Sequence, residues 1–142
     1  MGATGRRVRA CAAAAILVLA AAVAALGGGS AVAAAKPGVI VAWGSDADGQ
    51  LGNGAAGGHL KEAPVPGMTG IIDTHGGREH VVALKQNGTV WAWGMNNDGQ
   101  VGDGTKIDRL APVQMKGLTH VIAVRTGHYS SFALESDGTV WA

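Results

Sequence analysis

The sequence predicts an all-β fold that forms part of a β-propeller, and two observations support this prediction. First, the chain contains an internal repeat with a period of 50 residues: segments 42–54 and 92–104 are identical at eight of 13 positions. Second, no segment after residue 36 shows a helical hydrophobic period, and that region holds 19 of the 24 glycines. A fixed period of this length is typical of stacked supersecondary units, and small sheets repeated around an axis form a propeller.

The first 35 residues have the features of a secretory signal peptide, which we expect to be helical. Arg6, Arg7 and Arg9 precede an uninterrupted apolar run over 10–26, and small residues that suit cleavage follow it. The run is short for a membrane-spanning helix, so an uncleaved anchor is the less favoured alternative. The sequence thus predicts a signal peptide over 1–35, repeats over 36–142, and a secreted, extracellular protein that meets the membrane only before cleavage.

Removal of residues 1–35 would take away the single cysteine, Cys11, and three of the 11 basic residues. The remaining chain would carry eight basic and ten acidic residues, which is a formal net charge of −2. Disulfides, thiol catalysis and cysteine-bound metals would then be excluded. Because no basic patch remains, we expect no binding to nucleic acid.

Each copy of the repeat predicts a β-hairpin. In the first copy, two runs rich in strand-forming residues, 81–86 and 89–93, flank Asn87 and Gly88, a pair that suits the two positive φ angles of a type I′ turn. The second copy repeats this pattern over 131–142. The two hairpins should therefore occupy equivalent places in neighbouring units.

A third strand is expected before each hairpin, because apolar pairs occur at 71–72 and 121–122. Pro64 and Pro112, each in an Ala-Pro-Val sequence, mark the connection that leads to this strand. Each unit is thus predicted to contain one small sheet of three strands.

Trp91 and Trp93 are two residues apart on a predicted strand and therefore share one face, while Ala92 and Gly94 share the other. Burying one Trp removes about 150–250 Å² from water, so such residues would dominate the core. The small opposite face would let a neighbouring sheet approach closely. We expect the following positions to fix the backbone or the core: Trp43, Gly44, Gly49, Gln50, Gly52, Gly77, His80, Gly88, Trp91, Trp93, Gly94, Gly99, Gln100, Gly102, Gly127, Gly138 and Trp141.

Several motifs follow one another in a fixed order: Gly-x-x-His, an apolar strand, Asn/Asp-Gly-Thr-Val-Trp-Ala, and Trp-Gly followed by Gly-Gln-Leu/Val-Gly-x-Gly. With these motifs the chain resembles the regulator of chromosome condensation repeat family, and among its members the secreted, bacterial-type ones. The resemblance implies a seven-bladed propeller, to which residues 38–142 would contribute about two blades. Ser130 and Val101 depart from the family pattern, which has His and Leu at these places; His80 conforms in the other copy.

We expect the chain to be a fragment of a longer propeller, with the remaining blades missing. Two units are fewer than the three or so that a repeat protein ordinarily needs for stability. A natural short chain that assembles its ring from several copies is the alternative.

Metal and catalytic motifs are incomplete. Segments 46–49 and 96–99 look like part of a calcium loop, but Ala55 and Thr105 stand where its closing Glu should be. The five histidines lack zinc-site spacing, apart from His75 and His80 across a Gly-Gly turn, and no Ser-His-acid or Walker motif occurs. We therefore predict no catalytic residues, no cofactor and no metal.

The candidate binding residues are those that differ between the copies on connecting segments, together with acidic neighbours, because loops on a rigid scaffold carry function. Tyr129 is the only tyrosine, and amphipathic aromatic residues often anchor interfaces. The predicted protein-binding residues are Asp46, Asp48, Arg78, Glu79, Asn96, Asn97, Asp98, His128 and Tyr129.

The first functional hypothesis is a non-catalytic secreted module that binds an unidentified extracellular protein through loops at one end of the ring. The family resemblance implies two alternatives: guanine-nucleotide exchange on a small GTPase, and β-lactamase inhibition, for which Tyr129, Asp46 and Asp98 would be contacts. A further alternative is an accessory domain of a larger secreted enzyme.

Overall fold

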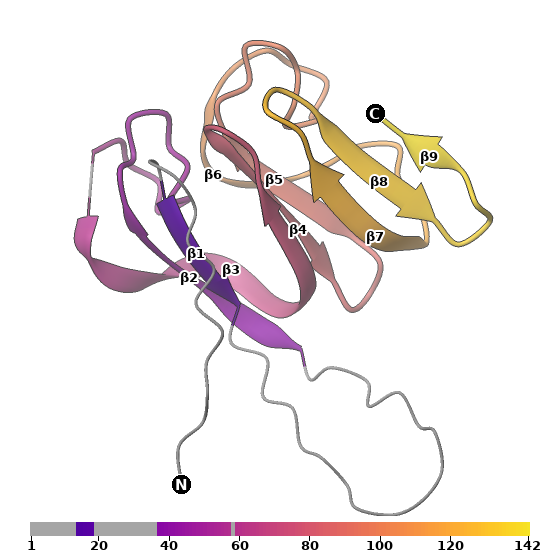
Figure 1. Ribbon diagram of the computed structural model, residues 1–142, viewed down its shortest axis with the longest axis horizontal. Coiled ribbons are helices and arrows are strands. Elements are labelled where there is room, and N and C mark those ends of the chain that lie inside the picture. The colour runs from indigo at the N-terminus through magenta and orange to yellow at the C-terminus, as the bar shows by residue number, and fades with distance from the viewer. Residues whose placement is uncertain (1–13, 19–36, 58) are drawn as a thin grey trace, which may run out of the picture.

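The computed structural model describes residues 14–18, 37–57 and 59–142, which form strands and loops without a helix (Figure 1). The strands are β1 (Ala14–Val18), β2 (Gly38–Gly44), β3 (His59–Gly76), β4 (His80–Lys85), β5 (Val90–Gly94), β6 (Arg109–Gln114), β7 (Val121–Thr126), β8 (Ser131–Glu135) and β9 (Val140–Trp141). Strands β1 to β6 form one antiparallel sheet in sequence order, and β7, β8 and β9 form a second. Within the described residues there is no helix that is long and apolar enough to cross a membrane. The all-β prediction is confirmed.

The repeating unit contains four strands. In the first complete unit, the C-terminal half of β3 pairs with β4, β4 pairs with β5, and β5 pairs with β6. The N-terminal half of β3 pairs instead with β2, so this one strand runs from one unit into the next. Positive φ angles at Gly67 and Gly70 allow the change of direction between the two halves.

The fourth strand was not expected from the sequence. Segment 109–114 and its counterpart 59–64, predicted as connections because of their prolines, are β6 and the start of β3. β6 lies at the edge of its sheet, where Pro112 removes a backbone donor without breaking an interior ladder. The prediction of three strands per unit is therefore wrong by one edge strand.

The hairpin turns also differ in type from the prediction. Gly88 has a φ of 80°, but Asn87 does not have a positive φ, so the type I′ turn is excluded. Gly88 N–H donates to Lys85 O and Lys85 N–H donates to Thr89 O, both at 2.9 Å, which is a three-residue loop ending in a left-handed glycine. Asn87 Oδ1 accepts from Thr89 N–H at 3.1 Å instead of adopting the left-handed region itself.

Most of the predicted signal peptide, residues 1–13 and 19–35, lies outside the described residues. Its described part, Ala14–Val18, is strand β1 and not helix; it pairs antiparallel with β2, with Ala14 opposite Gly44 and Val18 opposite Ile40. An apolar segment that includes Ile16 and Val18 and meets an open strand edge satisfies its backbone by pairing, which accounts for the strand. The assignment as a signal peptide stays a prediction.

Two hydrophobic cores lie on opposite sides of the central unit, and they are built from equivalent residues. The first core contains Ile40, Ala42, Leu51, Val65, Met68, Ile71, Val81, Ala83 and Trp93, with Trp91 packed against it. The second core contains Val82, Leu84, Val90, Ala92, Val101, Val121, Val124 and Ala133, with Val113, Met115 and Leu118 packed against it. Successive side chains of β5 thus alternate between the cores, as the Trp91, Ala92 and Trp93 pattern predicted.

Trp93 joins the two copies of the repeat. It is fully buried, and its indole Nε1–H donates to the carbonyl oxygen of Gln50 at 2.9 Å, 43 residues earlier in the chain. A Cβ at Gly52 would lie 2.7 Å from the Trp93 Nε1, so the loop at 50–52 can approach the indole only with glycine there. A Cβ at Gly94, where φ is 100°, would collide with the Glu79 carbonyl oxygen. The Trp-Gly and Gly-Gln-x-Gly motifs are therefore the two halves of one contact.

The other tryptophans, all predicted to be core residues, are less buried. Trp43 and Trp91 are intermediate, and Trp141 is 48% exposed. Lys85 Nζ lies 4.7 Å from the centre of the Trp91 ring, a cation–π distance, which explains how a partly exposed indole is covered.

His80 connects three segments. It is 1% exposed, its Nε2 lies 3.1 Å from Ser131 Oγ, and that hydroxyl donates to the Gln100 carbonyl oxygen at 2.6 Å. His80 is one of the positions that the sequence predicted to fix the backbone or the core, and in the structure its ring reaches the next repeat. Burial lowers the pKa of His80, because the charged ring would lose its solvation.

Replacement of Trp93 by Ala should lower the free energy of unfolding by about 3–5 kcal/mol, because it leaves a cavity in the first core. Trp93→Phe should cost less, since the ring remains and only the donor to Gln50 is lost. Urea unfolding followed by far-UV circular dichroism measures both. Ile122→Ala, at an exposed position of β7, serves as the control and should change the value by no more than about 0.5 kcal/mol; an equal loss there would contradict this role of Trp93.

Acid should destabilise the fold through His80. Because its folded pKa is depressed, the unfolded chain binds the proton more readily, so stability is complete above the ordinary pKa of about 6.5 and falls as the pH drops below it. His80→Gln, which keeps an N–H near Ser131, should flatten the change in unfolding free energy between about pH 7.5 and about pH 5. His128→Gln, at an exposed position, should keep the wild-type dependence. If the unfolding free energy of wild type and of His80→Gln depended on pH in the same way, His80 would not be the group responsible.

Candidate protein-binding surface

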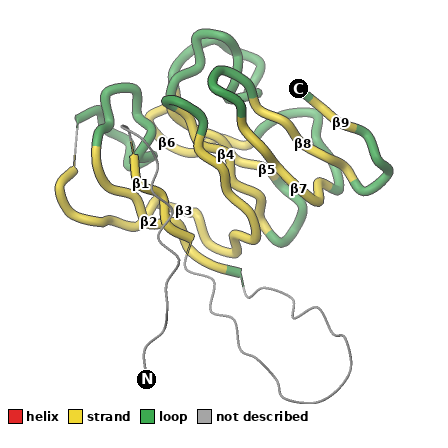
Figure 2. The backbone as a smooth tube through the Cα atoms, in the orientation of Figure 1, coloured by secondary structure: helices red, strands yellow, loops and turns green. Residues whose placement is uncertain are grey.

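The loops that follow β2 and β5 are closed by the same two hydrogen bonds in both copies. Leu51 N–H donates to Asp46 Oδ1 at 2.8 Å, and Val101 N–H donates to Asn96 Oδ1 at 2.9 Å. The side-chain amides of Gln50 and Gln100 accept from the backbone two residues earlier, each at 3.0 Å. Both loops lie at the same end of the sheets, opposite the β4–β5 turn (Figure 2).

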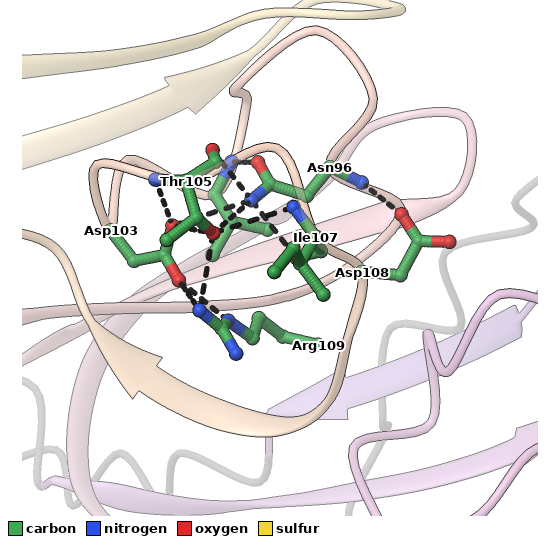
Figure 3. Close-up of polar contacts among 7 residues, drawn as sticks. Asn96, Asp103, Thr105, Ile107, Asp108 and Arg109 are labelled. Carbon is green, nitrogen blue, oxygen red and sulfur yellow. Dashed lines mark hydrogen bonds and ion pairs between the residues drawn. The ribbon is translucent and has the colours of Figure 1, made fainter.

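The second loop carries an additional polar network around Asn96 (Figure 3). Asn96 Nδ2 donates to the Thr105 and Ile107 carbonyl oxygens at 3.0 and 3.1 Å, and Asp103 accepts from Thr105 N–H and forms an ion pair with Arg109. Burial raises the pKa of Asp103, but the hydrogen bonds from Thr105 and Arg109 outweigh it and lower the pKa to about 2. The loop is therefore held by its own side chains.

Two predicted binding residues belong to this internal scaffold. Asp46 is 1% exposed and Asn96 is fully buried, and both hold the loop backbone through the bonds above. The other seven, which are exposed or partly exposed, we call the loop-end surface: Asp48, Arg78, Glu79, Asn97, Asp98, His128 and Tyr129.

The centre of the loop-end surface is a contact between equivalent turns of the two copies. The Arg78 guanidinium donates to the Tyr129 hydroxyl, and its carbon lies 5.8 Å from the centre of the tyrosine ring. Arg78 N–H also donates to the His128 carbonyl oxygen at 3.3 Å, and the His128 and Tyr129 rings meet edge to face at 5.5 Å. The hydrogen bond to Tyr129 raises the pKa of Arg78. Residues predicted separately from two copies thus form one group.

Acidic side chains surround this group. Burial raises the pKa of Asp48, and the nearby carboxylates of Glu79 and Asp108 raise it further, while Arg78 lowers it. Glu79 also forms an ion pair with Arg78 at 3.5 Å. Asp98 lines the same cavity as Tyr129.

Asp108 is a member of this acidic group that the sequence interpretation missed. Its carboxylate repels that of Asp48 and so raises the pKa of Asp48. Its Oδ1 accepts a hydrogen bond from Asn96 N–H at 2.7 Å. Its counterpart in the first copy is Gly58, so this position differs between the copies and a comparison of them could have identified Asp108. Asn97 is exposed, and among the described residues no hydrogen bond, ion pair or ring contact joins its side chain to the others. The described residues include no cluster of three or more His, Cys, Asp or Glu side chains able to hold a metal.

Three solved structures are similar in fold to this chain. Human WBSCR16 has a TM-score of 0.64 and 18% identity, with 74% of this chain and 30% of that chain covered. Yeast RCC1 (Prp20), solved bound to Kap60, has a TM-score of 0.60 and 24% identity, with 72% and 24% covered. Prp20p from Saccharomyces cerevisiae, in a structure reported with its binding to Gsp1p and histones, has a TM-score of 0.56 and 22% identity, with 72% and 28% covered.

The chain therefore spans less than a third of the length of these proteins. No curated protein matches the sequence. Two family models, both described as regulator of chromosome condensation (RCC1) repeat, match residues 87–134 and 72–100. With the propeller neighbours, these matches show that the chain belongs to the regulator of chromosome condensation repeat family and that its sheets are part of a propeller.

Proposed function

We propose that this chain is a non-catalytic module that binds another protein through its loop-end surface. The observation that carries the proposal is the Arg78–Tyr129 pair, which places an exposed arginine and tyrosine together across two copies of the repeat. Arg and Tyr are among the residues that dominate binding energy at protein interfaces. Both stand on short turns between paired strands, so little conformational entropy would be lost on binding.

The charge of the surface indicates the character of the partner. Glu79 and Asp48 lie near Arg78, Asp108 lies near Asp48, and Asp98 lines the same cavity as Tyr129, so the rim is mainly acidic. Complementary potentials steer association and exclude wrong partners, which favours a partner with a basic patch. The yeast relatives support the binding of proteins in general, since their structures name Kap60, Gsp1p and histones as partners.

We further propose that the partner is extracellular, because the apolar run over 10–26 and the arginines before it have the features of a signal peptide. Exchange activity on a cytosolic GTPase would require retention of the chain inside the cell. A pull-down from culture medium is therefore the first search for the partner.

Tyr129→Ala should weaken binding of the captured partner by at least about 2 kcal/mol, or roughly 30-fold in Kd, because the aromatic anchor is lost. The partner is captured from culture medium on immobilised full-length chain, and its Kd is then measured for each variant. Arg78→Ala should also weaken binding, whereas Gln114→Ala, at an exposed site on β6, should not. If no protein is captured, or if Tyr129→Ala leaves Kd unchanged while the fold is intact, this surface is not the binding site.

A further inference from the structure

His80 is a buried titratable side chain that links the two turns at the centre of the loop-end surface. It is 1% exposed, and its Nε2 lies 3.1 Å from Ser131 Oγ, 51 residues later. The hydrogen bond from Arg78 to Tyr129 also spans 51 residues. On one turn His80 stands two residues after Arg78, and on the other Ser131 stands two residues after Tyr129. The two contacts are therefore a buried and an exposed connection between the same pair of turns.

The hydrogen bonds of Ser131 define which form of the His80 ring fits between the turns. The hydroxyl donates its only hydrogen to the Gln100 carbonyl oxygen at 2.6 Å, so towards His80 it can only accept, and Nε2 must carry the ring hydrogen. The other ring nitrogen, Nδ1, is buried and has no hydrogen-bond partner among the described residues. A proton added to Nδ1 would create a buried charged donor without an acceptor, which is costly. Burial accordingly lowers the pKa of His80 by more than the Ser130 backbone raises it.

The ring is also packed tightly where the two turns meet. A Cβ at Gly77 would lie 2.1 Å from His80 Cε1 and 2.9 Å from the Gly127 carbonyl oxygen. Gly77 is thus close to the ring and to the opposite turn at the same time. A shift of the ring would therefore change the spacing of the two turns.

The equivalent turn of the second copy shows that the turn itself does not need a histidine. Gly77 N–H donates to His80 O at 2.8 Å, and Gly127 N–H donates to Ser130 O at 2.9 Å, so both turns close in the same way. Ser130, the counterpart of His80, does not titrate in the physiological range. The titratable ring therefore belongs to the junction between the copies.

No charged side chain nearby offsets a proton on the ring. The charged or titratable side chains on the segments around His80 are Arg78 and Glu79 on its own turn, His128 and Tyr129 on the facing turn, Asp98 on the second loop and His75 on β3. Among the described residues none of these forms a hydrogen bond or ion pair with the ring, and none of them shifts the pKa of His80.

We propose, building on the function proposed above, that protonation of His80 separates the 77–80 turn from the 127–131 turn and takes the Arg78–Tyr129 pair apart, so that the loop-end surface is assembled at neutral pH and lost in acid. The closed form accepts only the neutral ring, whereas water solvates the charged ring once the turns separate. The closed form is thus fully favoured above the ordinary pKa of about 6.5 and gives way as the pH falls below it. At about pH 5 the separated form should be favoured up to about 30-fold more than at neutral pH.

Hydrogen exchange of the full chain, followed by NMR between about pH 8 and about pH 5, tests this proposal. The reporter is Arg78 N–H, whose bond to the His128 carbonyl oxygen at 3.3 Å crosses the two turns. Its protection factor should fall by about tenfold to about 30-fold over this range. The buried Ala83 amide in β4 should stay at least about tenfold better protected at each pH, because local separation needs less free energy than unfolding.

Two variants assign the effect to one histidine. His80→Gln should make the protection factor of Arg78 N–H independent of pH. His128→Gln, which keeps the backbone acceptor but removes the ring that contacts Tyr129, should leave the pH dependence as in wild type. If His80→Gln does not fold, the midpoint of the change at Arg78 N–H in wild type is compared with the titration of the His80 and His128 ring resonances, and it should follow His80.

The proposal is overturned if the protection of Arg78 N–H in wild type does not change with pH, or if it equals that of Ala83 at each pH, since the contact would then open only on unfolding. A pH dependence that persists in His80→Gln, or that follows His128, overturns it as well. No partner takes part in this measurement, so its failure leaves the proposed binding function intact. Conversely, failure to capture a partner at neutral pH counts against that function and not against the separation of the turns.

Discussion

The hydrogen bond from the Trp93 indole to the Gln50 carbonyl is the contact on which the arrangement of these sheets depends. It ties the end of β5 to a loop of the preceding copy, and it requires glycine at 52 for access and at 94 for the close passage of Glu79. Both cores then follow, because the alternating side chains of β5 enter one core with Trp93 and the other with Ala92. The period of 50 residues repeats the Trp-Gly and Gly-Gln-x-Gly motifs that make this contact. A repeat protein is stabilised by such interfaces between neighbours as much as by the units themselves.

The polar side chains of the loops divide into two groups with different tasks. Asp46 and Asn96 point inward, and with Gln50, Gln100 and Asp103 they satisfy backbone groups that no strand pairs. Buried polar networks of this kind fix a conformation when every member is bonded. The outward side chains of the same loops, Asp48 and Asp98, are therefore presented from a backbone that is already ordered. Arg78 and Tyr129 lie on separate short turns, which are closed by backbone hydrogen bonds from Gly77 N–H to His80 O at 2.8 Å and from Gly127 N–H to Ser130 O at 2.9 Å. This division explains how loops rich in glycine can support a defined surface.

Much of the fold could be predicted from the sequence, since period-2 strands, Gly-containing turns and paired tryptophans report local structure and burial directly. The hairpins, the strand at 121–126 and the burial of Trp93 were found in this way. The edge strand at 109–114 was missed because an edge needs neither an apolar face nor a complete set of donors, and Pro112 imitates a connection. For the site, variation between copies identified Arg78 and Tyr129 but not their contact, which depends on how two units pack. The same criterion selected Asn96, because a side chain that bonds inward within a loop has the composition of one that faces outward.

The passage of β3 from one unit into the next joins these two units in one six-stranded sheet with a common backbone. In an array of separate blades joined by flexible connections, one blade can open while its neighbour stays folded. Here β2 pairs with the first half of β3 and β4 pairs with its second half, so the two units meet within one continuous strand and not across a flexible connection. In a one-dimensional lattice model of a repeat protein, the coupling between adjacent units would therefore come from the main chain as well as from side-chain packing. We therefore expect the two units that share β3 to melt together.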